Sequence, residues 1–180
     1  MGQILSKLQI SMKLLLFTFF VFAMSISVYC KTPKWYLNFK QVELMVSTKQ
    51  MVEELFNYPE IVYAYNGGWS KNIDYKIKEG KLSVSYSQGK CSEGNLSEYD
   101  VDKDVVIGIT IRLKEKVSFS KLGVNLNNFD KREIRDLVGV FTYVDDNTGE
   151  WFNGTKQKLG DFKLFPPKNK EYLKCKGIIK

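Results

Sequence analysis

The chain contains no histidine. Histidine is the side chain that most often moves protons near neutral pH, and its imidazole is the commonest metal ligand in proteins. Its absence excludes a Ser-His-Asp triad, a Cys-His nucleophile pair and every zinc site that depends on an imidazole. We therefore expect a protein that is not an enzyme and that binds no metal or other cofactor.

Cysteine is also scarce, with residues at positions 30, 91 and 175 only. Cys91 and Cys175, 84 positions apart, cannot form a zinc site that needs four thiolates. Cleavage after Cys30 would leave an even pair, which in an oxidising compartment predicts a disulfide between Cys91 and Cys175. Two buried, reduced thiols are the alternative, because free cysteine is often a core residue.

No phosphate-binding or calcium-binding motif is complete. Residues 66–69 (NGGW) lack the GxxxxGK[ST] frame of a phosphate loop, so their glycines indicate a turn. Residues 98–104 (EYDVDKD) carry four acidic side chains at alternate positions, where they could supply oxygen ligands to calcium. The EF-hand spacing fails, because Val105 and Ile111 occupy positions that require glycine and glutamate. A solvated acidic loop is the preferred interpretation, and a hydrolase with two distant carboxylates stays open.

The longest apolar segment lies near the N-terminus, at residues 14–28. It follows Lys13, contains no charged residue and has small residues near its end, which is the pattern of a secretory signal. It is short for a membrane-spanning helix, which needs about 20 apolar residues. We therefore predict a signal peptide over residues 1–30, with removal during export.

The predicted mature protein is a single β-rich domain over residues 31–180, secreted to the extracellular space. Met12 is an alternative start for the signal. Two competing interpretations stay open besides a retained anchor. Gly2 fits the acceptor pattern for myristoylation, and Cys30 would carry the lipid of a lipoprotein, although the bulky Tyr29 before it disfavours that processing. Two sequons, at Asn95 and Asn153, have the sequence surroundings of turns, predict a glycoprotein and agree with export.

Most of the predicted domain has the two-residue period of strands. Residues 35–46 read as a strand with a bulge near Lys40 and Gln41. A capping box beginning at Ser47 predicts a helix that starts at Thr48 and stops before Pro59. Alternating apolar residues then predict a hairpin over residues 73–86 and a long central strand over residues 105–113.

The C-terminal half adds further strands. Asp130 and Glu133 have capping-box spacing and predict a second helical turn. A hairpin around residues 145–151, a strand ended by the prolines at 166–167 and a last strand carrying Leu173, Cys175 and Ile179 complete the pattern. The predicted fold class is α+β and mainly antiparallel β, with seven to eight strands that form a sandwich, a barrel or a curved sheet with one short packed helix.

The function that this pattern favours is binding. Aromatic residues make up 14% of the chain, enough to line an apolar cavity between a sheet and a helix, or simply to fill a core. We predict a carrier or sequestering protein for a small apolar ligand, with cavity residues Met51, Val52, Leu55, Phe56, Tyr63, Tyr75 and Tyr86. The alternative is a secreted effector or inhibitor that binds a host or partner macromolecule through loop tips and a basic face.

The formal net charge of +7 raises the question whether the protein binds nucleic acid or another anionic partner. An exported protein rarely meets nucleic acid, and the lysines are not interleaved with aromatic residues as a stacking platform requires. We therefore expect no nucleic-acid partner and a monomeric protein. Lys174, Lys176 and Lys180 near the C-terminus predict weak contact with anionic surfaces, unless they form only a solvated strand face.

Overall fold

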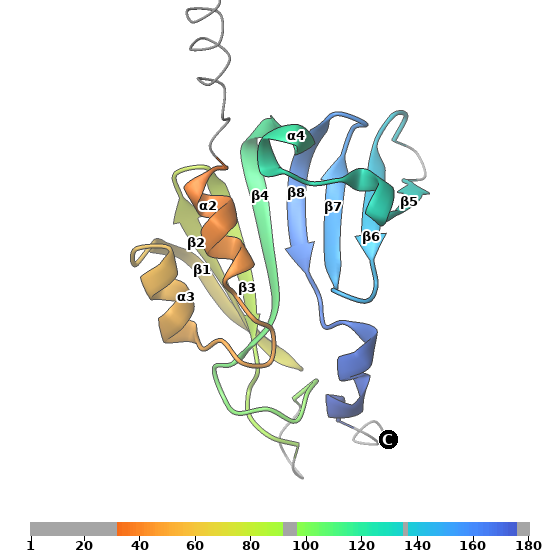
Figure 1. The fold of residues 1–180 in the computed structure, drawn as a ribbon. Coiled ribbons are helices and arrows are strands. Elements are labelled where there is room, and N and C mark those ends of the chain that lie inside the picture. The colour runs from red at the N-terminus through yellow and green to blue at the C-terminus, as the bar shows by residue number, and fades with distance from the viewer. Residues whose placement is uncertain (1–31, 92–96, 135–136, 176–180) are drawn as a thin grey trace, which may run out of the picture. The chain divides into compact units, whose positions relative to one another are not determined.

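The structure, a computed structural model, describes residues 32–91, 97–134 and 137–175 (Figure 1). The chain divides into two units, residues 1–31 and 32–180, and every described residue belongs to the second. The predicted signal peptide, with its alternatives at Gly2, Met12 and Cys30, and the sequon at Asn95 lie outside the described residues.

An eight-stranded antiparallel sheet forms the second unit (Figure 1). Its strands are β1 Glu60–Gly67, β2 Ser70–Ile77, β3 Gly80–Tyr86, β4 Val106–Ser118, β5 Asp130–Glu133, β6 Phe141–Asp145, β7 Glu150–Gly154 and β8 Lys158–Leu164. The order across the sheet is β1-β2-β3-β4-β8-β7-β6-β5, so β1 and β5 are its two edges. The mainly antiparallel α+β prediction is confirmed, and the sheet is open rather than closed into a barrel.

Buried and more exposed residues alternate along β2 and β3, because only one face of the sheet is packed. Ile73, Tyr75 and Ile77 of β2 are buried, and the residues between them face the other side. The predicted hairpin of β2 and β3 and the long strand β4 are confirmed, and β4 lies in the middle of the sheet as its apolar pattern suggested.

The helical elements cover one face of the sheet (Figure 1). They are α2 Lys34–Lys40, α3 Lys49–Leu55, α4 Phe119–Leu122 and the 3-10 segment η1 Leu126–Asn128, and a second 3-10 segment, η2 Lys168–Leu173, follows β8. The core between them is aromatic. Phe39 of α2 packs on Phe162 with ring centroids 4.4 Å apart, and Phe162 stacks on Phe152 at 4.4 Å. Aromatic rings of this size supply much of the burial that holds a domain together.

The predicted strand over residues 35–46 is wrong, because its first half forms α2. Trp35, Tyr36 and Phe39 share one helical face and are all buried. Leu37, which the strand pattern placed on the same side as Trp35, is 48% exposed. Packing of Tyr36 and Phe39 on Phe162 of β8, together with burial of Trp35, outweighs the local two-residue period.

The predicted helix after Thr48 is confirmed as α3, but its cap differs from the prediction. Thr48 itself is the N-cap, and its Oγ1 accepts a hydrogen bond from the Met51 amide at 3.3 Å. Ser47 is buried, and its Oγ accepts from the Glu43 amide at 2.9 Å. The helix ends at Leu55, where the chain turns toward β1.

Two C-terminal predictions are wrong. Asp130 and Glu133 bound strand β5 rather than a helical turn, because the segment pairs with β6 and the Lys131 ammonium lies 3.8 Å from the Phe141 ring centroid. Leu173 of the predicted last strand instead ends η2, whose N-cap is Pro167, and Lys174 then forms an isolated antiparallel bridge with Tyr99. Ile179 and the basic residues Lys176 and Lys180 lie outside the described residues.

Candidate functional site

Three of the predicted cavity residues are fully buried in the protein interior. Val52, Tyr75 and Tyr86 are each 0% exposed. The Tyr75 and Tyr86 hydroxyl oxygens lie 3.1 Å apart, and the Tyr75 hydroxyl donates to Glu53 Oε1 at 3.2 Å. Tyr75, Tyr86 and Glu53 therefore hydrogen-bond one another in the interior where a ligand was expected.

The two tyrosines stay protonated in neutral solution. Burial raises the pKa of Tyr75 to about 12, and the Glu53 carboxylate adds to this rise, while the hydrogen bond with Tyr86 opposes it. Burial also raises the pKa of Tyr86, with its hydrogen bond to Tyr75 as the next cause. The pair can donate hydrogen bonds, but neither phenol is prepared to act as a base near neutral pH.

The other predicted cavity residues lie elsewhere. Leu55 and Phe56 are half-buried and line a hollow of about 420 Å³ at the end of α3. Met51 is 44% exposed on the outer side of the helix. Tyr63 is 59% exposed and pairs with Asp74, which places it on the open face of the sheet. The seven residues thus divide among the interior, the hollow and the surface.

An exposed apolar surface follows strand β1. Every residue from Glu60 to Asn66 is exposed, including Ile61, Val62, Tyr63 and Tyr65. The strand is eight residues long, and only β2 pairs with it among the described parts of the chain. A long apolar edge strand presents unpaired backbone N–H and C=O groups to any polypeptide that reaches it, and in β1 the pairing with β2 is regular from Tyr63 to Gly67, after a register shift at Ile61. We call this surface the β1 edge.

The two edge strands, β1 and β5, differ in length and in charge, and both properties affect whether another chain can pair with them. β5 has four residues, Asp-Lys-Arg-Glu, and all four carry charge. Short, charged edge strands discourage pairing with another chain. β1 is twice as long and has a single charged residue, Glu60, so only one of the two edges is protected.

Aromatic and polar side chains flank the β1 edge on the open face of the sheet. The Tyr63 and Tyr65 rings lie with centroids 5.4 Å apart. Next to Tyr63, Asp74 accepts a hydrogen bond from Lys81 Nζ at 2.9 Å. Partial burial raises the pKa of Asp74, but the Ser83 hydroxyl, Lys81 and Arg112 lower it by more, so the carboxylate stays ionised.

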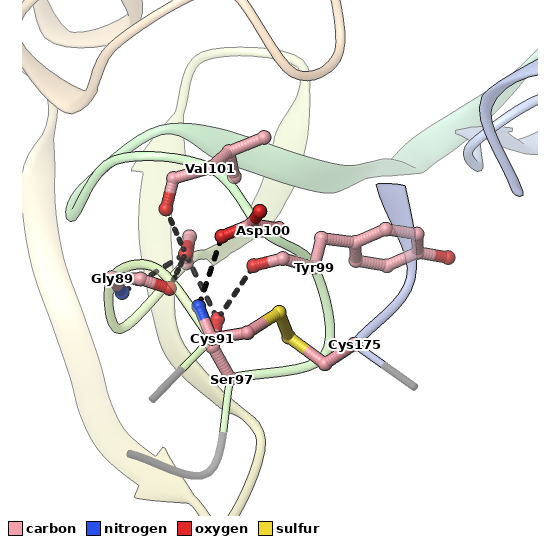
Figure 2. The surroundings of a disulfide bond; sticks show 8 residues. Gly89, Cys91, Ser97, Tyr99, Asp100, Val101 and Cys175 are labelled. Carbon is pink, nitrogen blue, oxygen red and sulfur yellow. Dashed lines mark hydrogen bonds between the residues drawn. A yellow bond between two sulfur atoms is a disulfide. The ribbon is translucent and has the colours of Figure 1, made fainter. Parts of the chain in front are cut away.

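The disulfide holds one end of the β1 edge in place. Cys91 and Cys175 are bonded, as predicted (Figure 2). The Cys175 amide donates to the Glu98 carbonyl at 3.1 Å, and the Glu98 amide donates to the Trp69 carbonyl at 3.2 Å. Trp69 forms the tip of the β1–β2 hairpin, so the disulfide-bonded segment is attached to that tip.

Buried serines support the same segment (Figure 2). The Ser87 and Ser97 hydroxyl oxygens lie 3.0 Å apart, and Ser97 donates to the Tyr99 carbonyl at 3.1 Å. Both serines are at most 1% exposed. Because a buried hydroxyl is costly unless it is hydrogen-bonded, these bonds hold Ser97 and Tyr99 against Ser87 at the end of β3.

The acidic residues of the same loop have separate partners. Asp100 accepts from the Cys91 amide, Asp102 pairs with Lys90, and Asp104 pairs with Lys71. Within the described parts of the chain, no three such side chains are grouped as a metal site would require. The sequon residue Asn153 lies in β7 and accepts a hydrogen bond from Thr142, so it is in a strand rather than a turn.

Comparison with protein families, curated proteins and solved structures finds no match for the chain. None of the helices in the described residues has the length and apolar character needed to cross a membrane. The β1 edge was missed by sequence reasoning. The only sequence feature that points to this edge is the apolar run at residues 61–65. Because a buried strand has the same kind of run, the run does not identify an exposed edge.

Proposed function

We propose that the protein is a binding protein that captures an extended segment of a partner polypeptide by strand addition at the β1 edge. The observation that carries this proposal is the eight-residue, exposed and largely uncharged edge strand β1 beside a fully charged opposite edge. In strand addition, main-chain hydrogen bonds supply affinity and alternate side chains supply specificity.

The register of the β1–β2 hairpin predicts which groups receive the partner. Gly67 and Ser70 flank a two-residue turn, so the turn hydrogen bond joins them. In an antiparallel pair every second residue faces the neighbouring strand, which makes Tyr65 and Tyr63 the next residues bonded to β2. Ala64 and Asn66 then direct their N–H and C=O groups outward, toward an added strand.

Side chains on both faces of β1 would contact that strand. Tyr63 and Tyr65 lie on the open face, and Ile61 is opposite Tyr75 on the helix-covered face. Cross-strand pairs with aromatic or β-branched residues contribute about 0.2–1 kcal/mol each. A partner segment with apolar side chains at alternate positions therefore fits this edge best.

An extracellular location agrees with this function. The Cys91–Cys175 disulfide supports secretion, because disulfides persist in oxidising compartments. In that setting the protein acts as a secreted effector or inhibitor. A carrier of a small apolar ligand is the second candidate, and its support is confined to the hollow beside Leu55 and Phe56.

A pair of variants at Ala64 tests strand addition. Peptides are first selected from a random phage-displayed library against the protein, and their affinities are then measured by isothermal titration calorimetry. Ala64→Pro removes one outward N–H without touching the β1–β2 hydrogen bonds, and proline is tolerated in edge strands. We expect peptide binding to weaken by about tenfold, or about 1.4 kcal/mol, since one partner group loses its hydrogen bond.

Ala64→Ser is the matched control, because it keeps the N–H and should bind the peptides as the wild type does. Peptides that bind all three proteins equally would show that they use another surface and would refute the proposal. A dimer that Ala64→Pro dissociates would instead make a second copy of the chain the partner, contrary to the monomer that we expect.

A further inference from the structure

A second surface lies outside the proposed strand-addition site. The hollow of about 420 Å³ opens where the start of α2, the end of α3 and the end of β2 meet. Its lining includes Trp35, Leu55, Phe56 and Ile77, with Lys34 and Lys78 at the rim. Its volume is within the range of about 300–1,000 Å³ that small-molecule sites occupy. We call it the Trp35 groove.

The floor of the Trp35 groove is apolar. Trp35 and Ile77 are 6% and 7% exposed, and Leu55 and Phe56 are half-buried beside them. The Asn38 side-chain amide donates to the Leu55 carbonyl, so this backbone group near the end of α3 is already satisfied. The floor therefore offers contact area to a hydrocarbon chain rather than hydrogen bonds.

The rim of the groove is basic. Lys34, Lys76 and Lys78 line it together with one acidic residue, Glu79. Lys76 pairs with Glu60 at 3.2 Å, whereas Lys34 and Lys78 form no ion pair with any other described residue. Two lysines at the mouth of an apolar hollow are complementary to an anionic head group.

The chain beside the groove has an unusual conformation. Asn57 and Tyr58 are both left-handed, with φ of 60° and 49°. Asparagine adopts this region readily, but a bulky residue such as tyrosine does so at a cost. Tyr58 is also 69% exposed, so its side chain gains little from burial. Strained backbone of this kind clusters at ligand sites, which agrees with a binding role.

We propose that the Trp35 groove binds one free fatty carboxylate, with the hydrocarbon tail on the apolar floor and the carboxylate at Lys34 and Lys78. The same groove would disfavour a cationic amphiphile of equal tail length, because the lysines repel its head group. This inference does not depend on strand addition at β1, which uses a different part of the surface.

Tryptophan fluorescence of the full chain locates the ligand. Trp69→Phe and Trp151→Phe leave Trp35 as the only tryptophan, and both replaced residues lie outside the groove. The probe is 12-bromododecanoate, whose bromine quenches indole fluorescence on contact. We expect saturable quenching of Trp35 below the concentration at which the probe forms micelles. Each buried methylene strengthens binding, so decanoate should compete more weakly than dodecanoate, by about fourfold per methylene.

Charge-removing variants test the head-group contact. Lys34→Gln with Lys78→Gln should weaken dodecanoate binding by about tenfold, since two exposed charge contacts are lost. Lys103→Gln with Lys156→Gln removes the same charge from exposed positions outside the groove and should leave the affinity unchanged. Thermal unfolding of each variant confirms that the fold is retained.

Several results would overturn the proposal. They are absent or non-saturable quenching of Trp35, equal affinity for dodecyltrimethylammonium, and equal affinity in the two lysine variants. Binding to vesicles of phosphatidylcholine with phosphatidylserine, without binding of monomeric dodecanoate, would assign the lysines to a membrane surface and would also overturn it. Because Ala64→Pro leaves the groove intact, failure here and failure of strand addition are separate outcomes.

Discussion

Removal of the disulfide should produce a large loss of stability. The change is Cys91→Ala together with Cys175→Ala, which opens a loop closed across a sequence separation of 84 residues. In the chain-entropy model, a loop of this length restricts the unfolded chain by about 4–5 kcal/mol. A domain of this size has about 5–15 kcal/mol of stability, so the double variant should lose a large share of it.

Contacts in the folded state should change little in this variant. The Asp100 amide donates to the Leu173 carbonyl at 2.7 Å, and the Cys175 amide donates to the Glu98 carbonyl at 3.1 Å. These backbone hydrogen bonds do not involve sulfur, so they can persist when both thiols are gone. The loss should therefore come mainly from the unfolded state, whose conformational freedom increases.

Urea unfolding followed by circular dichroism measures this loss. We expect the midpoint to fall with a free-energy difference of about 4–5 kcal/mol relative to the oxidised wild type. The wild type under a reducing agent is the control and should match the double variant. A difference below about 1 kcal/mol would refute the reasoning, because it would mean that the C-terminal segment detaches before the sheet unfolds.

Three further substitutions test the packing, the helix cap and the buried tyrosine, each by urea unfolding. Phe162→Ala should lower the free energy of unfolding by about 3–5 kcal/mol, since the ring is fully buried, and a loss near zero would contradict the aromatic core. Thr48→Ala should cost about 1 kcal/mol as the N-cap of α3, and an unchanged stability would assign the cap elsewhere. Because the pKa of Tyr75 is raised from 10.0 to about 12, its stabilisation is complete below pH 10 and is lost as pH rises toward 12. Tyr75→Phe should show a smaller alkaline loss, and an equal loss in both proteins would refute this assignment.

The sequence pattern predicted correctly those strands that are packed on one face and solvated on the other along their whole length. β2 and β3 alternate because one side is packed and the other is solvated, so their residue order alone identifies them. α2 was mistaken for a strand because Trp35 and Phe39, four residues apart, fit both a two-residue and a helical period. Contact with Phe162, which is distant in sequence, decides between the two.

The two candidate sites depend on arrangements that no local pattern contains. An apolar run such as Ile61–Tyr65 indicates a strand, but whether that strand lies at an edge depends on which strands pair across the whole sheet. The Trp35 groove combines Lys34, the first residue of α2, with Lys78, which follows β2, so that all of α3 and two strands lie between them in the sequence. The disulfide was different, because removal of Cys30 with the predicted signal leaves a single pair, and that pair, Cys91 and Cys175, is bonded.

Amide hydrogen exchange along β1 tests strand addition most directly. It is measured by NMR in the free protein and with a selected peptide bound. We predict that the Ala64 and Asn66 amides exchange rapidly in the free protein and become protected on binding, while the Lys131 amide of the charged edge β5 does not change. Protection already present in the free protein, or protection that appears elsewhere while Ala64 and Asn66 still exchange rapidly, would contradict the account.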